Sequence, residues 1–334
     1  MTPNGIVRIV SLILSVFVLV LFTTACSGGE EKANSKTKEE TIVLTGVTPV
    51  NSDDYLASAF HVFAEKIEKN SDGRIKIEYK GGPETIAPME QGEALGSGVV
   101  DFAVTPAAYY AATVPEGLAL SYSELSIEEE LERGSIDYLN KIHNDKLNVQ
   151  LLGRGTSAKF GLFLKEKIDS VDDLKGLRLR GTPTYGPLFE KVGANLITLP
   201  SGDIFESLDK GVIDGFGWIE TGITKLGLQD LAKYHVEPFY LNVDVVTIMN
   251  LDKWNSLPED IKKIIMDTQR EVEKELPAVR DQFKTEDAEK LKGAGIERID
   301  LGEQFPDIAN EAGWDFIERK LPEQNADLIK YFRK

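Results

Sequence analysis

Residues 173–186 read D-L-K-G-L-R-L-R-G-T-P-T-Y-G, and residues 197–220 read I-T-L-P-S-G-D-I-F-E-S-L-D-K-G-V-I-D-G-F-G-W-I-E. Leucine and arginine alternate over 177–180, which predicts a strand with one face on a core and both guanidinium groups on the other. Arg180 directly precedes Gly181, so it should lie at the carboxyl end of this strand, where open α/β sheets hold ligands. A guanidinium there can bind a carboxylate through two hydrogen bonds. The alternative is a surface arginine paired with a neighbouring acid.

This stretch resembles the signature of the DctP-like solute-binding proteins of TRAP (tripartite ATP-independent periplasmic) transporters. Three pieces of that signature occur in order, at 173–180, 193–200 and 211–215, and the resemblance extends from about residue 41 to the C-terminus. It implies an α/β, two-lobed, periplasmic-binding-protein-like fold, with hinge strands crossing between the lobes and a long C-terminal helix spanning both. It also implies that Arg180 binds the carboxylate of a ligand.

The length of 334 residues also favours two lobes over one core. We expect lobe I to comprise residues 41–152 plus about 246–284, and lobe II to comprise 153–245 plus about 285–334. The sequence G-V-V-D at 98–101 is echoed by G-V-I-D at 211–214, each after a predicted helix. Two lobes of similar topology would explain the echo, and the loops that follow would then face each other across a cleft.

Polar and aromatic side chains follow several of the predicted strands. Thr105 and Tyr109 lie in the loop after one echo, Trp218 and Glu220 lie after the other, and Asn51 lies in the exit loop of a strand at 41–45. We predict that all five line the cleft. Core packing is the alternative for the two aromatic residues, and for Trp218 the resemblance favours the pocket.

Two segments are predicted to cross between the lobes, near residues 153–160 and 240–249. The resemblance implies a second ligand-binding side chain in the first of them. Lys159 is our candidate and Arg154 its competitor. On the second crossing, Asn242 and Asp244 could line the cleft, although a carboxylate there would repel an anion unless it accepts from a ligand hydroxyl or amine.

The N-terminus has the pattern of a signal peptide with a lipoprotein cleavage site. Arg8 precedes an apolar or small run at 9–22, and small residues precede Cys26, the only cysteine of the chain. We predict removal of residues 1–25, lipid modification (palmitate) of Cys26, a flexible linker over 26–40 and a location on the outer face of the cytoplasmic membrane. The alternative is a retained anchor helix in the same membrane.

Charge and composition exclude some functions. The formal net charge of −17 argues against nucleic acid as a partner, and an anion site must rely on local cations. The acidic run at 128–132 is predicted to be a solvent-exposed face. The resemblance has one departure: relatives that bind α-keto acids through a metal carry a glutamine that is missing between Leu151 and Glu220, and a glutamate where Gly217 stands. We therefore predict no metal and no cofactor.

No sequence motif of an enzyme is present, whether a nucleophile elbow, a zinc-protease helix or a phosphate-binding loop. The leading hypothesis is an extracytoplasmic solute-binding protein that captures a small organic acid by hinge closure and delivers it to TRAP permease subunits. A ligand-sensing lipoprotein that acts with a membrane sensor kinase is the alternative. A lipoprotein hydrolase is a third possibility.

Overall fold

The computed structural model describes residues 41–334. The predicted signal peptide, the lipidation site at Cys26 and the linker lie outside the described residues. Within residues 41–334, no helix is both long enough and apolar enough to span a bilayer.

The first of two sheets has five strands in the order β2-β1-β3-β10-β4. Its strands are β1 (Ile42–Val47), β2 (Ile75–Gly81), β3 (Phe102–Pro106), β4 (Val149–Arg154) and β10 (Val245–Asn250). Strand β1 is parallel to β2 and β3, whereas β10 is antiparallel to β3 and β4. The loops that follow β1, β3 and β4 therefore leave from the same edge of this sheet.

The second sheet has six strands in the order β11-β9-β5-β8-β6-β7. Its strands are β5 (Lys159–Leu164), β6 (Arg178–Arg180), β7 (Asn195–Ile197), β8 (Gly215–Ile219), β9 (Tyr234–Asn242) and β11 (Glu297–Asp300). Strand β6 is parallel to both β7 and β8, so Arg180 at the end of β6 has neighbours from each. The strand predicted over 177–180 is thus confirmed, with Leu179 fully buried in the core.

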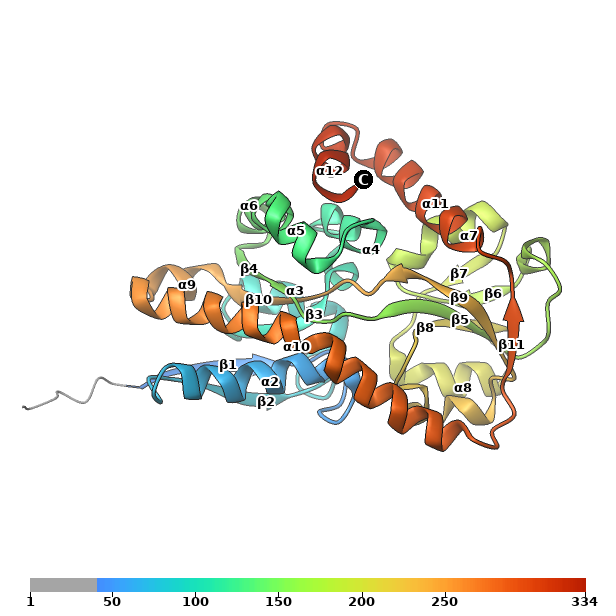
Figure 1. Cartoon of the computed structure of the whole chain (residues 1–334), viewed down its shortest axis with the longest axis horizontal. Helices are drawn as coiled ribbons and strands as arrows, with labels where there is room; N and C mark the ends of the chain where they lie inside the picture. The colour runs from blue at the N-terminus through green and yellow to red at the C-terminus, as the bar shows by residue number, and fades with distance from the viewer. Residues whose placement is uncertain (1–40) are drawn as a thin grey trace, which may run out of the picture. The chain divides into compact units, whose positions relative to one another are not determined.

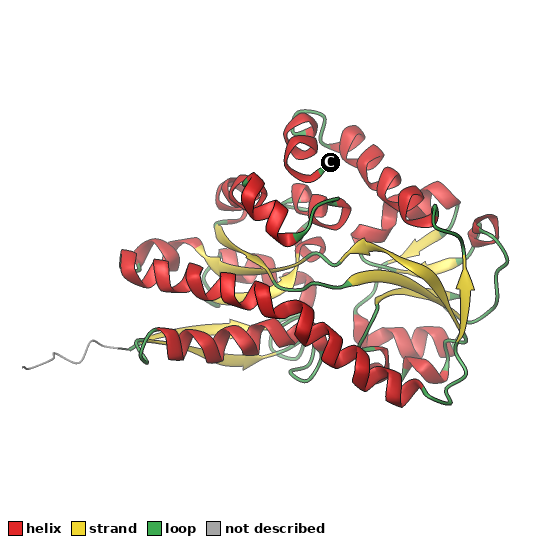
Figure 2. Cartoon of the chain, viewed as in Figure 1, coloured by secondary structure: helices red, strands yellow, loops and turns green. Residues whose placement is uncertain are grey.

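Helices pack against both sheets (Figure 2). Those before β5 are α2 (Tyr55–Asn70), α3 (Gln91–Gly96), α4 (Ala119–Tyr122), α5 (Ile127–Arg133) and α6 (Ser135–Leu147). Those after β5 are α7 (Gly186–Val192), α8 (Ile204–Asp209), α9 (Leu251–Ser256), α10 (Glu259–Leu291), α11 (Phe305–Lys320) and α12 (Asn325–Phe332). Helix α2 shows why the pattern folds this way: its apolar positions Phe60, Phe63 and Ile67 recur at helical spacing and are buried, and the Asp54 carboxylate caps its first turn.

Two short segments connect the sheets. Residues 155–158 lead from β4 to β5, and residues 243–244 lead back from β9 to β10. Both crossings lie where the sequence predicted them. The 33-residue helix α10 contacts α2 and β4 near the first sheet and the short helix η7 (Ile223–Leu226) near the second (Figure 1). This confirms the predicted long helix that reaches both lobes.

The C-terminal helices pack on different parts of the molecule. Helix α11 contacts α7, β9 and α4, and α12 contacts α4, α5 and α6. The predicted range of lobe II, about 285–334, therefore includes a helix that packs on elements preceding the first crossing. The exact lobe boundaries stay a prediction.

One expectation was wrong for a single residue. The acidic run at 128–132 was predicted to face solvent, and Glu128 and Glu132 are exposed, but Glu130 is fully buried. Its carboxylate forms two hydrogen bonds with the guanidinium of Arg154, at 2.7 and 2.8 Å. Arg154, which is distant in sequence, supplies the positive charge that compensates for the burial of this carboxylate.

Candidate functional site

Arg180 lies at the carboxyl end of β6 and is only 2% exposed. Its Nε donates to the carbonyl of Leu199 (3.0 Å), and its Nη1 donates to the carbonyl of Gly217 (3.2 Å). Among residues 41–334, Nη2 has no hydrogen bond of good geometry and the guanidinium forms no salt bridge with a carboxylate, while the Tyr109 hydroxyl lies close enough to act on the guanidinium as a hydrogen-bonding group. Burial lowers the pKa of Arg180, yet an arginine keeps its charge at any physiological pH. The site therefore holds a buried positive charge that the described chain does not neutralise.

Arg178 shows that this burial belongs to one end of the strand. It lies two residues earlier, on the same face of β6, but its side chain is 45% exposed. Its guanidinium forms a two-point ion pair with Asp214, at 3.0 and 2.5 Å. Arg178, and not Arg180, thus forms the surface ion pair that was the alternative interpretation of Arg180.

Trp218 lies on β8, the strand beside β6. Its ring centre is 5.8 Å from the Arg180 guanidinium carbon, within the range of a cation–π contact. The side chain is buried, and its Nε1 donor has no partner in the described part of the chain. The structure thus places a second unsatisfied donor on the side chain that contacts the Arg180 guanidinium.

Gly217 precedes Trp218, and its backbone carbonyl binds Arg180. A Cβ atom at position 217 would come within 2.2 Å of the Tyr185 ring. Any side chain here would therefore displace that aromatic residue, which is itself fully buried. Across residues 41–334, no group of three or more histidine, cysteine, aspartate or glutamate side chains is arranged to hold a metal ion.

Tyr109 approaches Arg180 from the first sheet. It belongs to the short helix η2 (Ala107–Tyr110), which follows β3 and contacts the short helix η5 (Pro183–Tyr185) just after β6. Burial raises the pKa of the Tyr109 hydroxyl, and the positive charge of Arg180 offsets part of that rise. Thr105, near the end of β3, is fully buried, and its Oγ1 has no partner among the described residues. Of the two predicted residues of this loop, Thr105 is therefore buried, whereas Tyr109 is half-buried and within electrostatic reach of the guanidinium.

Asp244, on the second crossing, joins a segment that follows β3 of the first sheet to one that follows β6 of the second sheet. Its Oδ2 accepts from the backbone N–H of Ala108 (2.8 Å) and from Thr184 Oγ1 (3.2 Å). These donors adjoin Tyr109 and Tyr185, the two tyrosines on which Arg180 acts electrostatically. The Asp244 side chain is fully buried, and Oδ1 has no partner within the part of the chain that the structure covers. Burial raises the pKa of Asp244 to about 6, against the lowering effect of its hydrogen bonds.

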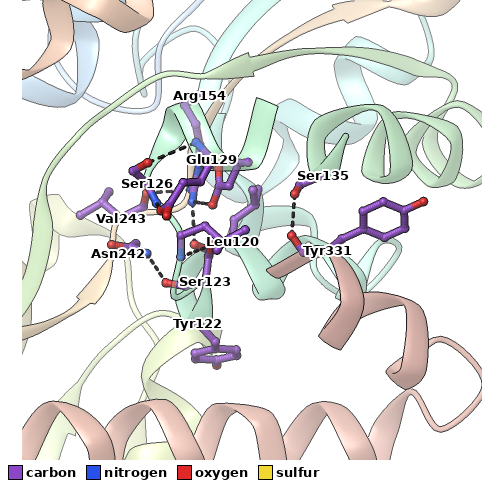
Figure 3. A network of polar contacts seen from close by, with 12 residues as sticks. Leu120, Tyr122, Ser123, Ser126, Glu129, Ser135, Arg154, Asn242, Val243 and Tyr331 are labelled. Carbon is purple, nitrogen blue, oxygen red and sulfur yellow. Dashed lines mark hydrogen bonds and ion pairs between the residues drawn. The ribbon is translucent and has the colours of Figure 1, made fainter. Parts of the chain in front are cut away.

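Arg154 is paired within the protein, although its positive charge also lowers the pKa of Asp244. Besides its ion pair with Glu130, its Nη2 donates to the carbonyl of Leu120 (2.8 Å) (Figure 3). Its backbone N–H donates to Glu273 of α10 (2.8 Å). These contacts join β4 to α4, α5 and α10. Which of Lys159 and Arg154 binds a ligand stays a prediction.

Lys159 lies apart from Arg180. Its Nζ donates to Asn242 Oδ1 (2.6 Å), and Asn242 in turn donates to the carbonyl of Ser123 (2.7 Å) (Figure 3). The residue lines a cavity of about 260 Å³ with Arg154 and Arg280. Arg180, Trp218 and Tyr109 do not line this cavity.

Glu220 and Asn51 also differ from the expected arrangement. One Glu220 oxygen accepts from the backbone N–H of Lys159 (3.1 Å), and the other pairs with Lys284 of α10 (2.8 Å). Both oxygens thus tie β8 to its neighbours. Asn51 is exposed and lines a second cavity, of about 400 Å³. Pro200, in the wall of that cavity, directly follows Leu199, whose carbonyl binds Arg180.

The sequence predicted Arg180 and Trp218 as central residues, but it did not predict the unsatisfied donor and acceptor atoms around them. Arg180, Trp218 and Tyr109 do come together, from β6, β8 and η2. Asp244 was considered only as a lining residue, because a sequence does not show that one oxygen would be held by two loops. An aspartate in the short segment between two strands of different sheets was the available signal.

The chain was compared with known proteins. Residues 47–313 match the family model described as bacterial extracellular solute-binding protein, family 7. A monocarboxylate 2-oxoacid-binding periplasmic protein from Nostoc sp. is 26% identical over 290 residues, which are 81% of this chain and 78% of that protein.

Solved structures share the fold. A TRAP periplasmic solute-binding protein from Desulfovibrio salexigens with bound orotic acid superposes with a TM-score of 0.79 at 19% identity, covering 87% of this chain and 97% of the other. An extracytoplasmic solute receptor from Bordetella pertussis that binds pyroglutamic acid gives a TM-score of 0.74 at 18% identity, covering 88% and 100%.

Proposed function

This chain belongs to the bacterial extracellular solute-binding proteins of family 7, and on that premise we propose that it captures a small organic acid outside the cytoplasm for a TRAP transporter. In this proposal Arg180 binds the carboxylate of the ligand. The protein binds and releases its solute without chemical turnover, in keeping with a family of solute-binding proteins.

One observation carries the proposal. The Arg180 guanidinium is buried, has no acidic partner among residues 41–334, and keeps Nη2 without a hydrogen bond of good geometry. Leaving a charge unpaired away from water costs several kcal/mol, on the order of 3–5 when one partner of a buried pair is missing. A carboxylate ligand would supply both the missing charge and the missing acceptor. Arg154, which is equally buried, shows how this chain treats an arginine with a structural role: it pairs it with Glu130.

The comparisons support the same ligand class. Both of the structural neighbours described above have a carboxylic acid as their ligand, and the Nostoc relative is named for monocarboxylates. These identities lie below 30%, so they favour an acid without identifying it.

The other site residues differ in how directly they would contact the ligand. Trp218 Nε1 donates to the ligand, and Thr105 and Tyr109 close the site from the side of the first sheet. Asn51 lines the cavity of about 400 Å³ whose wall includes Pro200. Leu199, the residue before Pro200, accepts a hydrogen bond from Arg180. Lys159 and Glu220 would contact the ligand only after a rearrangement. Lys159 Nζ is hydrogen-bonded to Asn242, and Glu220 forms an ion pair with Lys284.

Capture would proceed by closure of the two sheets toward each other about the crossings at 155–158 and 243–244. Ligand contacts from both sides give the closed form a higher affinity, and only this difference can drive closure. Asp244 and its bonds to Ala108 and Thr184 join elements next to each side, so they would form or tighten on closing.

The partners follow from the same proposal. The closed form would be recognised by TRAP permease subunits, and a lipid on Cys26 would hold the protein at the outer face of the cytoplasmic membrane. The anchor is open to a direct test: mass spectrometry of the membrane-bound protein should find a lipid on Cys26 and no residues 1–25, and a protein that keeps residues 1–25 without a lipid would contradict it.

The function can be tested with matched ligands. The protein without residues 1–26 is screened by thermal shift against short monocarboxylates, dicarboxylates, keto acids and sugar acids, each paired with its uncharged carboxamide. We expect at least one acid to raise the melting temperature while its carboxamide does not. A protein that responds equally to acids and carboxamides would contradict carboxylate recognition.

A further inference from the structure

The charges around Arg180 limit what the ligand can be. In the part of the chain that the structure describes, Arg180 is the one buried cation without an acidic partner, because Arg154 is paired with Glu130. Lys159 lines a cavity that Arg180 does not line. A ligand carboxylate on Arg180 would therefore neutralise the only free positive charge here. A second carboxylate would be buried without a counter-ion, which is strongly unfavourable.

Asp244 restricts the ligand further. Its Oδ2 is fully used by Ala108 and Thr184, but its buried Oδ1 has no donor among residues 41–334. With a pKa of about 6, the group is a carboxylate at pH 8. An ionised oxygen in this position repels an anionic group and requires an N–H or O–H.

Shared neighbours place this acceptor in the same buried region as the carboxylate-binding group. Asp244 binds residues on either side of the contact between η2 and η5, and Arg180 ends the strand that leads into η5. Tyr109 and Tyr185 lie within electrostatic reach of both Asp244 and Arg180. One buried region thus holds free donors on Arg180 and Trp218 and a free acceptor on Asp244.

We propose that the ligand is a monocarboxylate that carries, near its carboxylate, an N–H or O–H group whose hydrogen is accepted by Asp244 Oδ1. This inference rests on the proposed function, because it takes Arg180 as the carboxylate-binding residue. It excludes dicarboxylates, which would place a second negative charge near Asp244. It also disfavours monocarboxylates without a donor, such as simple 2-oxoacids, because they leave Oδ1 unpaired.

The test uses pairs of probes of similar size in which one member carries the donor and the other lacks it. 5-Oxopyrrolidine-2-carboxylate has a ring N–H, and 5-oxotetrahydrofuran-2-carboxylate has a ring oxygen in its place. 2-Hydroxybutanoate and 2-oxobutanoate form an open-chain pair, and glutarate represents dicarboxylates. Affinities are measured by calorimetry at pH 8 with the protein lacking residues 1–26. We expect a donor-bearing probe to bind at least about 10-fold more tightly than its partner, since a hydrogen bond to a charged group is lost in the latter.

The variant Asp244→Asn, which keeps an acceptor oxygen but removes the charge, serves as a second readout. It should reduce the preference within each pair and improve the relative affinity for glutarate. The wild-type comparisons need no variant, so a folding defect in Asp244→Asn would not affect them.

The outcomes separate this inference from the function beneath it. Equal binding within both pairs, tighter binding of glutarate, or no binding of either donor-bearing probe would overturn the inference. If glutarate or 2-oxobutanoate binds and Arg180→Ala abolishes that binding, the proposed function stands while the inference fails. If a probe binds and Arg180→Ala leaves its affinity unchanged, the proposed function itself fails.

Discussion

The guanidinium carbon of Arg180 lies 5.8 Å from the ring centre of Trp218, and both side chains end in an N–H donor with no acceptor among residues 41–334. The two donors come from neighbouring strands, β6 and β8. Buried donors are almost always satisfied in folded proteins, so two unsatisfied donors on neighbouring side chains indicate a missing partner with more than one acceptor oxygen. A carboxylate has this property.

Removing the Trp218 donor should weaken ligand binding while the fold persists. In Trp218→Phe the aromatic ring remains but Nε1 is lost, and we expect about a 10-fold loss of affinity for the acid found in the carboxylate screen. Calorimetry measures the effect. Trp254→Phe on α9 is the matched control, because Trp254 packs near Lys262 and away from Arg180. Equal losses in both variants would contradict a role of Nε1.

Adding a methyl group at position 217 should disturb the site. The new Cβ of Gly217→Ala would overlap the Tyr185 ring, and we expect a loss of about 1–3 kcal/mol in the free energy of unfolding together with weaker ligand binding. Gly202→Ala is the control, since a Cβ there meets nothing within 4 Å. Urea unfolding of both variants checks the prediction, and an undisturbed Gly217→Ala would show that Tyr185 can move freely.

The ion pair between Arg154 and Glu130 should be structural. Glu130→Ala leaves a buried guanidinium unpaired, and we expect the free energy of unfolding to fall by about 3–5 kcal/mol. Glu128→Ala, from the exposed part of the same acidic run, should change it by less than about 0.5 kcal/mol. Should the two variants be equally stable, the assignment of Arg154 to the fold would be wrong.

Asp54 should give the protein a recognisable pH dependence. Burial raises its pKa to about 6 from an unfolded value of 3.8, so between these values the native state holds a proton that the unfolded state has released. Stability from this group is therefore lost as pH rises from about 4 to 6.5, by up to about 3 kcal/mol. Asp54→Asn keeps the helix cap and should remove this loss.

Its neighbour Asp53 provides the control for that experiment. The hydrogen bond from Lys225 lowers the pKa of Asp53, so its contribution has the opposite sign and is lost as pH falls. Unfolding by urea at several pH values should show that Asp54→Asn, but not Asp53→Asn, gains stability relative to wild type above pH 6. A parallel pH profile for wild type and Asp54→Asn would contradict the assigned pKa.

The strands and crossings could be predicted because their signals are local. Alternation over 177–180 and the position of Arg180 before Gly181 both depend on adjacent residues, and both agree with β6. The same local signal could not separate Arg178 from Arg180. Whether an arginine on one face is exposed depends on what covers its end of the strand, here Leu199 and Gly217 from other parts of the chain.

The partners of charged residues were beyond the reach of sequence patterns for the same reason. In the sequence, Glu130 is one of several acids predicted to be exposed. Only the folded structure shows that Arg154, 24 residues later, packs against it. Glu220 was expected in the cleft, but Lys284, 64 residues away on α10, takes one of its oxygens. Such pairings depend on tertiary packing, which no spacing rule contains.

The most direct test of the central claim is a calorimetric titration of two variants from the same strand, Arg180→Ala and Arg178→Ala, with the acid identified in the screen. The account predicts that Arg180→Ala loses about 2–5 kcal/mol of binding free energy, whereas Arg178→Ala binds like wild type, with circular dichroism showing both to be folded. If Arg180→Ala is folded and retains its affinity, or if Arg178→Ala loses as much, carboxylate binding by Arg180 is contradicted.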